Sequence, residues 1–380
     1  MAEAAIDVAR LVRTFTELAR IDSPSGREGA VAAYCASVLG ECGCTVATDD
    51  AGERIGSDTG NLYAELPATA GESGSVVLTA HMDCVEPCEG VVVRVEGGVI
   101  CSDGTTVLGS DDKAGVAAIL ETVRTLAESG APHVAVKVVL SIQEELGCLG
   151  AKNLSAGSFR KGEPCYVLDG EGRPGTLCLA APYHYTFEAR FKGRASHAGV
   201  APEKGVSAIE AASLAVTRMR QRGFLGAVGQ WCASNVGRIE GGGATNVVAD
   251  SCTMTGECRA IDADDVERVR RGMDAAMNDA ARQTGATVEV DWNLEYKGFE
   301  LSEDDPVVER FRRAVEGIGL AFSVEKSAGG TDANMYVKLG VSPAVVSVGM
   351  QNFHATDEKI EVCDLANTAR IALALTSPEL

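Results

Sequence analysis

The 380-residue sequence is short of positive charge, with 34 lysines and arginines against 54 aspartates and glutamates and a formal net charge of -20. Nucleic acid and anionic membranes would be repelled by such a chain, so neither is expected as a partner. The sequence also contains no G-x-S-x-G nucleophile motif and no Walker A loop, which disfavours the hydrolases and nucleotide-binding proteins built on them.

Long hydrophobic runs are missing as well. Near the N-terminus, apolar residues between 6 and 18 are spaced like one face of a helix, but Arg10, Arg13 and Glu17 interrupt the apolar segment. This pattern predicts an amphipathic helix rather than a signal peptide or a membrane span.

The cysteines do not form a disulfide framework. There are thirteen of them, an odd number, scattered through a chain much larger than the small disulfide-stapled proteins. We therefore expect free thiols in a reducing cytoplasm. Cys84 and Cys88 follow His81 closely, which leaves a thiolate zinc site open, although no second cysteine pair completes a tetrahedral set.

The spacing of apolar residues predicts an α/β fold. Two short β-rich runs, 76–80 and 134–140, flank an apolar helical pattern over 114–126. This order of strand, helix and strand predicts a βαβ unit in a mostly parallel mixed sheet flanked by helices. Ligands of such sheets bind at the carboxyl ends of the strands.

The chain is longer than one compact core usually organises, which favours two domains. From about residue 181 the pattern changes to alternating strands and amphipathic helices, and βα order resumes after Lys297. We therefore predict a smaller α+β domain at 181–296, inserted into a discontinuous domain formed by 1–180 and 297–380.

Residues of metal-ligand type follow the predicted strands or begin the helix after them: His81, Asp111, Glu145, Asp169 and His354. Each alone has a structural explanation as a strand end, helix cap or turn residue. Together, two imidazoles and several carboxylates suit a pair of zinc ions with room for a shared water. The set predicts a hydrolytic centre that cuts amide bonds.

Residues next to these candidate ligands indicate which groups would orient a ligand, bind metal or transfer a proton. Asp83 can hydrogen-bond the imidazole nitrogen of His81 that faces away from a metal. Asp111 is the better bridging ligand, since it begins a helix, and Asp112 can serve as cap or supporting partner. Of the adjacent Glu144 and Glu145, one can bind metal while the other takes a proton from the attacking water.

At this point the chain resembles the co-catalytic dizinc peptidases that include peptidase T, glutamate carboxypeptidase and aminoacylase, and it is closest to the peptidase T-like branch. The resemblance rests on an ordered series of segments spread over nearly the whole chain: HMDCVEP, SDGTTVLGSDDKAGVAAIL, EELGCLGAK, GRASHAGVAPEKGVSAIE, ATNVVAD, GECRA, GGTDANMY and FHATDEKI.

The resemblance implies that His81 and Asp169 bind one zinc ion, that Glu145 and His354 bind the other, and that Asp111 bridges the two. Glu144 would be the general base, and Asp83 would orient His81. A glutamate four residues after the last histidine, here Glu358, matches the family's H-x-x-x-E ending. Cobalt or manganese would suit similar ligands.

The inserted segment resembles the family's lid or dimerisation domain, which implies a possible homodimer formed through it. There, His197 matches the residue that stabilises the transition-state oxyanion. Asn246 and Arg259 match positions that hold the carboxylate or backbone of the substrate. Asp169 resembles the aspartate of peptidase T rather than the glutamate of carboxypeptidase-type members, which favours peptides over acylated amino acids. The resemblance to the peptidase T-like branch implies an aminopeptidase of the tripeptidase type that acts on short peptides.

Two alternatives remain open at the sequence level. The same centre would serve an N-acyl-amino-acid amidohydrolase or a carboxypeptidase. A metal-bound peptide-binding protein without catalysis is also compatible with the ligand pattern, although the presence of Glu144 argues against it.

Overall fold

The computed structural model describes residues 4–69, 74–155 and 157–380. The chain divides into two compact units. Unit 1 consists of the described residues up to Leu179 together with Leu301–Lys326 and Thr331–Leu380. Unit 2 consists of Ala180–Glu300 and Ser327–Gly330.

Four parallel strands form the centre of the large sheet of unit 1. In spatial order they are β6 (Ala135–Ser141), β3 (Ser75–His81), β7 (Pro164–Gly170) and β16 (Ser342–Ser347). Beyond them lie antiparallel neighbours: β1 (Thr45–Thr48) and β2 (Leu62–Leu66) on one side, β8 (Thr176–Ala181) and β14 (Phe299–Glu300) on the other, and β15 (Ser323–Lys326), which pairs with β8. β3 and β7 are buried along nearly their whole length, as expected for parallel strands covered on both faces.

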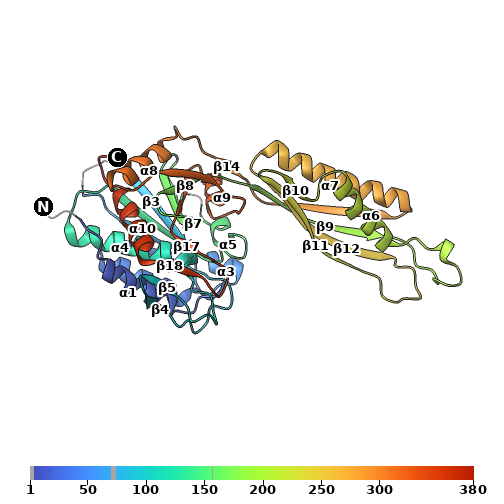
Figure 1. Ribbon diagram of the computed structural model, residues 1–380, viewed down its shortest axis with the longest axis horizontal. Helices are drawn as coiled ribbons and strands as arrows, with labels where there is room; N and C mark the ends of the chain where they lie inside the picture. Colours follow the sequence, from blue (N-terminus) through green and yellow to red (C-terminus); the bar gives the residue numbers. More distant parts are fainter. Residues whose placement is uncertain (1–3, 70–73, 156) are drawn as a thin grey trace. The chain divides into compact units, whose positions relative to one another are not determined.

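Four helices of unit 1 form a connected layer: α1 (Val8–Ala19), α4 (Ser110–Ser129), α8 (Pro306–Gly317) and α10 (Val362–Ala374). Of these, α4 and α8 contact the parallel strands. α4 lies against α1 and α10 and also contacts β3 and β7 (Figure 1). The other helices of unit 1 are α2 (Gly29–Glu41), α3 (Ala51–Ile55), α5 (Leu149–Lys152), α9 (Ala333–Tyr336) and the 3-10 turn η2 (Val337–Leu339). A small antiparallel sheet contains β17 (Met350–Gln351), β18 (Lys359–Glu361), β5 (Val99–Cys101) and β4 (Arg94–Glu96).

Helix α4 approaches strand β7 very closely at Gly115. A Cβ atom added at this glycine would lie 2.2 Å from the carbonyl oxygen of Leu168 and 2.6 Å from Oδ1 of Asp112. Neither contact leaves room for a side chain, so the helix start rests directly on the strand backbone.

Unit 2 has a five-stranded antiparallel sheet with two helices on one face. The strand order is β10 (Gly226–Gly229), β11 (Cys232–Gly241), β12 (Ser251–Ala260), β9 (Tyr183–Lys192) and β13 (Thr287–Tyr296). Helices α6 (Ala208–Gln221) and α7 (Ala263–Thr284) contact each other and the strands β9 and β12 (Figure 1). A 3-10 turn, η1 (Pro202–Lys204), precedes α6. Both helices begin at a capping side chain, Ser207 for α6 and Asp262 for α7.

The fold class predicted from the sequence is confirmed: a large mixed sheet flanked by helices, with smaller antiparallel sheets. The predicted βαβ unit is present, because β3 and β6 pair in parallel register on either side of α4 in the chain. Among the described residues, no helix is both long and apolar enough to cross a bilayer.

A buried ion pair ties the N-terminal helix to α4. Nε of Arg10 lies 2.8 Å from Glu121 Oε2, and the Glu121 side chain is fully buried. Arg10→Ala would leave that buried carboxylate without its cation and with only the Asp7 backbone N–H and the Thr125 hydroxyl as donors. We therefore expect unit 1 to lose about 3 kcal/mol of unfolding free energy in urea titrations. Arg10 also pairs with Glu128, whose side chain is 62% exposed. Glu128→Ala is the control and should cost less than about 1 kcal/mol; an equal loss in both variants would contradict the argument.

Candidate metal centre

The carboxyl ends of the four parallel strands meet at one edge of the sheet and carry the predicted ligands. His81 is the last residue of β3, and Asp169 lies one residue before the end of β7. Glu145 follows β6 after a short turn, His354 lies in the loop after β17, and Asp111 begins α4. Segments far apart in the sequence therefore bring five side chains of metal-ligand type together.

Asp111 lies between the two histidines. Its Oδ1 is 2.9 Å from Nε2 of His81, and its Oδ2 is 3.1 Å from Nε2 of His354. Asp169 Oδ1 lies 3.6 Å from the same His81 nitrogen, and Glu145 Oε1 lies 2.9 Å from the His354 nitrogen. The arrangement is two sets of one imidazole and one carboxylate, with one oxygen of Asp111 facing each set.

These donor atoms fit a pair of divalent cations. Donors held by one tetrahedral zinc at bond lengths of about 2.0–2.2 Å lie roughly 3.3 Å apart. The separations of 2.9–3.6 Å found within the two sets lie around that value. Nitrogen and carboxylate donors are also the chemistry that zinc accepts, so the residues present suit two ions with Asp111 shared between them.

The excess of carboxylates in the cluster is also compatible with bound cations. Burial raises the pKa of the Asp169 carboxyl to about 7. Hydrogen bonds to Asp111 and Glu145 raise the pKa of His354 to about 10. The nearby carboxylates Asp111 and Glu145 add to the Asp169 shift, so negative charge in the cluster favours the protonated form of both groups. Divalent cations would neutralise the same charge while leaving the imidazole nitrogens as ligands.

Asp83 holds the histidine and the glutamate segment together. Its Oδ1 lies 3.3 Å from Nδ1 of His81, while the ring nitrogen also approaches the Asp83 carbonyl oxygen at 3.0 Å. The same carboxylate accepts the backbone N–H groups of Glu144 at 2.9 Å and Glu145 at 3.2 Å. The hydroxyl of Ser25 donates to it at 2.7 Å. Fully buried, Asp83 fixes both the ring orientation and the turn that presents the glutamates.

Glu28 supports that turn from the other side, a role that sequence analysis missed. Its Oε1 accepts the backbone N–H of Gln143 at 3.0 Å and that of Gly26 at 2.8 Å, and Ser57 donates to Oε2 at 2.7 Å. Gln143 has a φ of 49°, a left-handed conformation that is uncommon for a residue other than glycine. The signal in the sequence was weak: a short polar segment with one glycine, SPSGRE, just before a helix.

Glu358 holds the loop that leads into Asp111. Its carboxylate accepts the backbone N–H groups of Leu108 at 2.7 Å, Gly109 at 2.8 Å and Asp111 at 3.1 Å, and the hydroxyl of Ser110 at 2.6 Å. Only 1% of the residue is exposed. The residue four positions after His354 therefore fixes the backbone of the central carboxylate.

Asp112 belongs to the supporting framework. One of its oxygens accepts the backbone N–H of His81 at 3.2 Å and the other that of Gly115 at 3.1 Å. Both oxygens are thus used by main-chain donors, as expected for a helix cap, although Asp112 also lies among the potential ligand atoms of His81 and Asp169.

Glu144 is next to the metal-ligand cluster and has its own neighbours. Burial raises the pKa of its carboxyl well above the usual value. The thiol of Cys148 donates to Oε1 of Glu144 at 3.3 Å, and Asp332 offers a carboxylate within 4.8 Å of both groups. Asp332 also accepts a hydrogen bond from Ser141. Sequence analysis did not single out Asp332, although it belongs to the quoted GGTDANMY segment.

The remaining predicted residues lie in unit 2. The backbone of His197 forms an isolated bridge with Val247, next to Asn246, whose carbonyl oxygen accepts the N–H of Ala198 at 2.9 Å. Nδ1 of the exposed His197 ring accepts the backbone N–H groups of Gly199 and Val200, both at 3.2 Å. A neutral His197 therefore carries its hydrogen on Nε2, which makes that nitrogen a donor.

The side chain of Arg259 forms an ion pair with a residue of its own strand, β12. Its guanidinium lies 2.9 Å from Glu257 Oε2, and the same oxygen lies 2.7 Å from His184 Nε2. Nη1 of Arg259 is 3.5 Å from the hydroxyl of Tyr296. The side chain is 33% exposed, which leaves part of the guanidinium accessible.

Comparison with known proteins shows which family this chain belongs to. A model of peptidase family M20/M25/M40 matches residues 77–377. The protein YqjE of Bacillus subtilis (strain 168), described as uncharacterized, is 35% identical over 370 residues, which cover 97% of this chain and 98% of YqjE.

Two solved structures are similar over almost the whole length. The aminopeptidase PepT from Bacillus cereus ATCC 10987 is 37% identical with a TM-score of 0.91, and the match covers 98% of this chain and 99% of that one. A tripeptidase from Staphylococcus aureus subsp. aureus Mu50 is 32% identical with a TM-score of 0.92, and 98% of each chain is covered. The chain therefore belongs to peptidase family M20/M25/M40 and is a metal-dependent, peptidase T-like hydrolase.

Proposed function

We propose that this chain is a dizinc aminopeptidase that hydrolyses short peptides, of the tripeptidase type. The observation that carries the proposal is the position of Asp111, with one oxygen toward His81 and the other toward His354. The aminopeptidase and the tripeptidase named above support the choice of substrate.

In this proposal the ligands divide as the geometry suggests. His81 and Asp169 would hold one ion, Glu145 and His354 would hold the other, and Asp111 would be shared between them. When bound, two such ions polarise the peptide carbonyl and lower the pKa of water toward about 7. Cobalt or manganese would satisfy the same donors.

The protein's own groups then move the protons. Glu144 accepts a proton from the attacking water at its carboxylate and delivers it to the leaving amine. Asp83 keeps the Glu144 backbone and the His81 ring in place through the contacts described above. Nε2–H of His197 donates to the developing oxyanion, and Asn246 and Arg259 hold the carboxylate or backbone of the peptide.

Further parts of the proposal concern the setting of the enzyme. Unit 2 is the inserted lid or dimerisation domain, and a homodimer would form through it. A cytoplasmic location, expected from the cysteine pattern, also stays a prediction.

Metal removal tests the centre itself. Dialysis against a chelator should abolish hydrolysis, and the restored enzyme should contain close to two zinc ions per chain by elemental analysis. The substrates should be di- and tripeptides with a free amino terminus, compared with their N-acetylated forms. Cleavage of N-acyl amino acids, or release from the carboxyl end only, would contradict the aminopeptidase assignment.

Adjacent glutamates allow a matched test of the proposed division between base and ligand. Glu144→Ala should retain both metal ions and lower kcat by several orders of magnitude, because water activation and leaving-group protonation are both lost. Glu145→Ala should instead lose metal and activity together. Normal turnover in Glu144→Ala, or unchanged metal content in Glu145→Ala, would show the roles to be misassigned.

His197→Ala tests the oxyanion donor. Removing such a donor typically costs on the order of 3 kcal/mol of transition-state stabilisation, or about 100-fold in kcat, with a much smaller change in KM. His197→Gln keeps an N–H donor and should recover part of the loss. An unchanged kcat in the alanine variant would make His197 an ordinary surface residue.

A further inference from the structure

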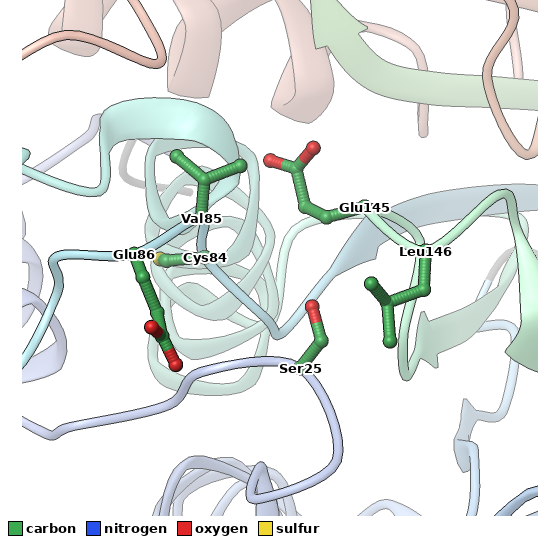
Figure 2. Close-up of a pocket in the computed structure, with 6 residues that line it drawn as sticks. All are labelled: Ser25, Cys84, Val85, Glu86, Glu145 and Leu146. Carbon is green, nitrogen blue, oxygen red and sulfur yellow. The ribbon is translucent and has the colours of Figure 1, made fainter. Parts of the chain in front are cut away.

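A small pocket opens beside the metal centre in unit 1. It has a volume of about 240 Å³ and is lined by Ser25, Cys84, Val85, Glu86, Glu145 and Leu146 (Figure 2). Sites for drug-sized ligands usually measure about 300–1,000 Å³, so this pocket suits one side chain rather than a whole peptide. Since Glu145 is both a wall of the pocket and a proposed metal ligand, a side chain bound here belongs to a substrate residue next to the scissile bond.

Two walls of the pocket are apolar. Val85 and Leu146 lie on opposite sides in Figure 2, and Leu146 is 57% exposed although it directly follows Glu145. Removing the exposed Leu146 side chain from water is favourable when an apolar group of a bound molecule packs against it. The methylene groups of a substrate side chain would provide that cover.

One wall of the pocket carries the negative charge of Glu86, for which the described part of the chain supplies no partner. Glu86 is exposed and has no hydrogen-bond or ion-pair partner among the described residues. Its neighbour Glu89, by contrast, pairs with Arg27. The hydroxyl of Ser25 already donates to Asp83, and Glu145 faces His354. The Glu86 carboxylate can therefore form an ion pair with a cationic side chain of a bound substrate.

We propose that this pocket selects substrates with a lysine or arginine side chain next to the scissile bond, an inference that rests on the proposed peptidase function. The aliphatic part of the side chain lies against Val85 and Leu146, and its cation pairs with Glu86. Acidic side chains are rejected because they would meet a like charge. Long cationic side chains commonly bind in this way, with the stem on an apolar surface and the charged end on a polar group.

A peptide series tests the proposal. Tripeptides X-Gly-Gly and Gly-X-Gly, with X as lysine, its uncharged analogue norleucine, or glutamate, are compared by kcat/KM. At one of the two positions the wild-type enzyme should prefer lysine over norleucine, and norleucine over glutamate. In Glu86→Gln the lysine-to-norleucine ratio should fall about fivefold, and in Glu86→Lys the order of lysine and glutamate should reverse.

The control is Glu96→Gln, an equal charge change at an exposed residue of β4 outside the pocket, which should leave the ratio as in the wild type. Leu146→Ala should lower kcat/KM for the lysine and norleucine peptides together. Equal wild-type rates for all three side chains, or a fall in the ratio in Glu96→Gln as large as in Glu86→Gln, would overturn the pocket assignment. Failure to hydrolyse any peptide would instead overturn the proposed function.

Discussion

The crowding of acidic side chains at the end of four parallel strands is the constraint on which the rest of unit 1 depends. Parallel strands expose their carboxyl ends at the same edge, so ligands carried there converge without long loops. Buried carboxylates at such close range repel one another and favour protonation unless positive charge lies between them. Metal cations bound at this edge of the sheet would supply that positive charge.

Main-chain N–H groups supply the rigidity that the cluster needs. Asp83 accepts two of them from the glutamate segment, and Glu358 accepts three from the loop before α4. Main-chain donors stabilise a buried carboxylate in its charged form and cannot rotate away from it as a flexible side chain can. The candidate ligands are thus positioned by buried carboxylates whose charge is stabilised by main-chain hydrogen bonds.

The side chains that cluster at this edge could be picked out from the sequence because the signal is local: a histidine or carboxylate after a β-rich run, or at the start of a helix. The same locality explains what was missed. Glu28 lies 115 residues from Gln143, and Asp332 lies 191 residues from Ser141, so only the folded chain reveals that they meet. For Asp112 the sequence indicated a cap or supporting role, and the structure supplies its main-chain partners, His81 and Gly115.

The close approach at Gly115 has a consequence for metal spacing. Asp111 lies four residues before this glycine, and Asp169 directly follows Leu168, whose carbonyl oxygen faces it. The separation of the Asp111 and Asp169 carboxylates is therefore limited by contact between two backbones, which is stiffer than contact between side chains. If both carboxylates bind metal as proposed, the site would accept divalent ions of similar radius more readily than larger ones, because the backbone contact limits how far the two carboxylates can move apart.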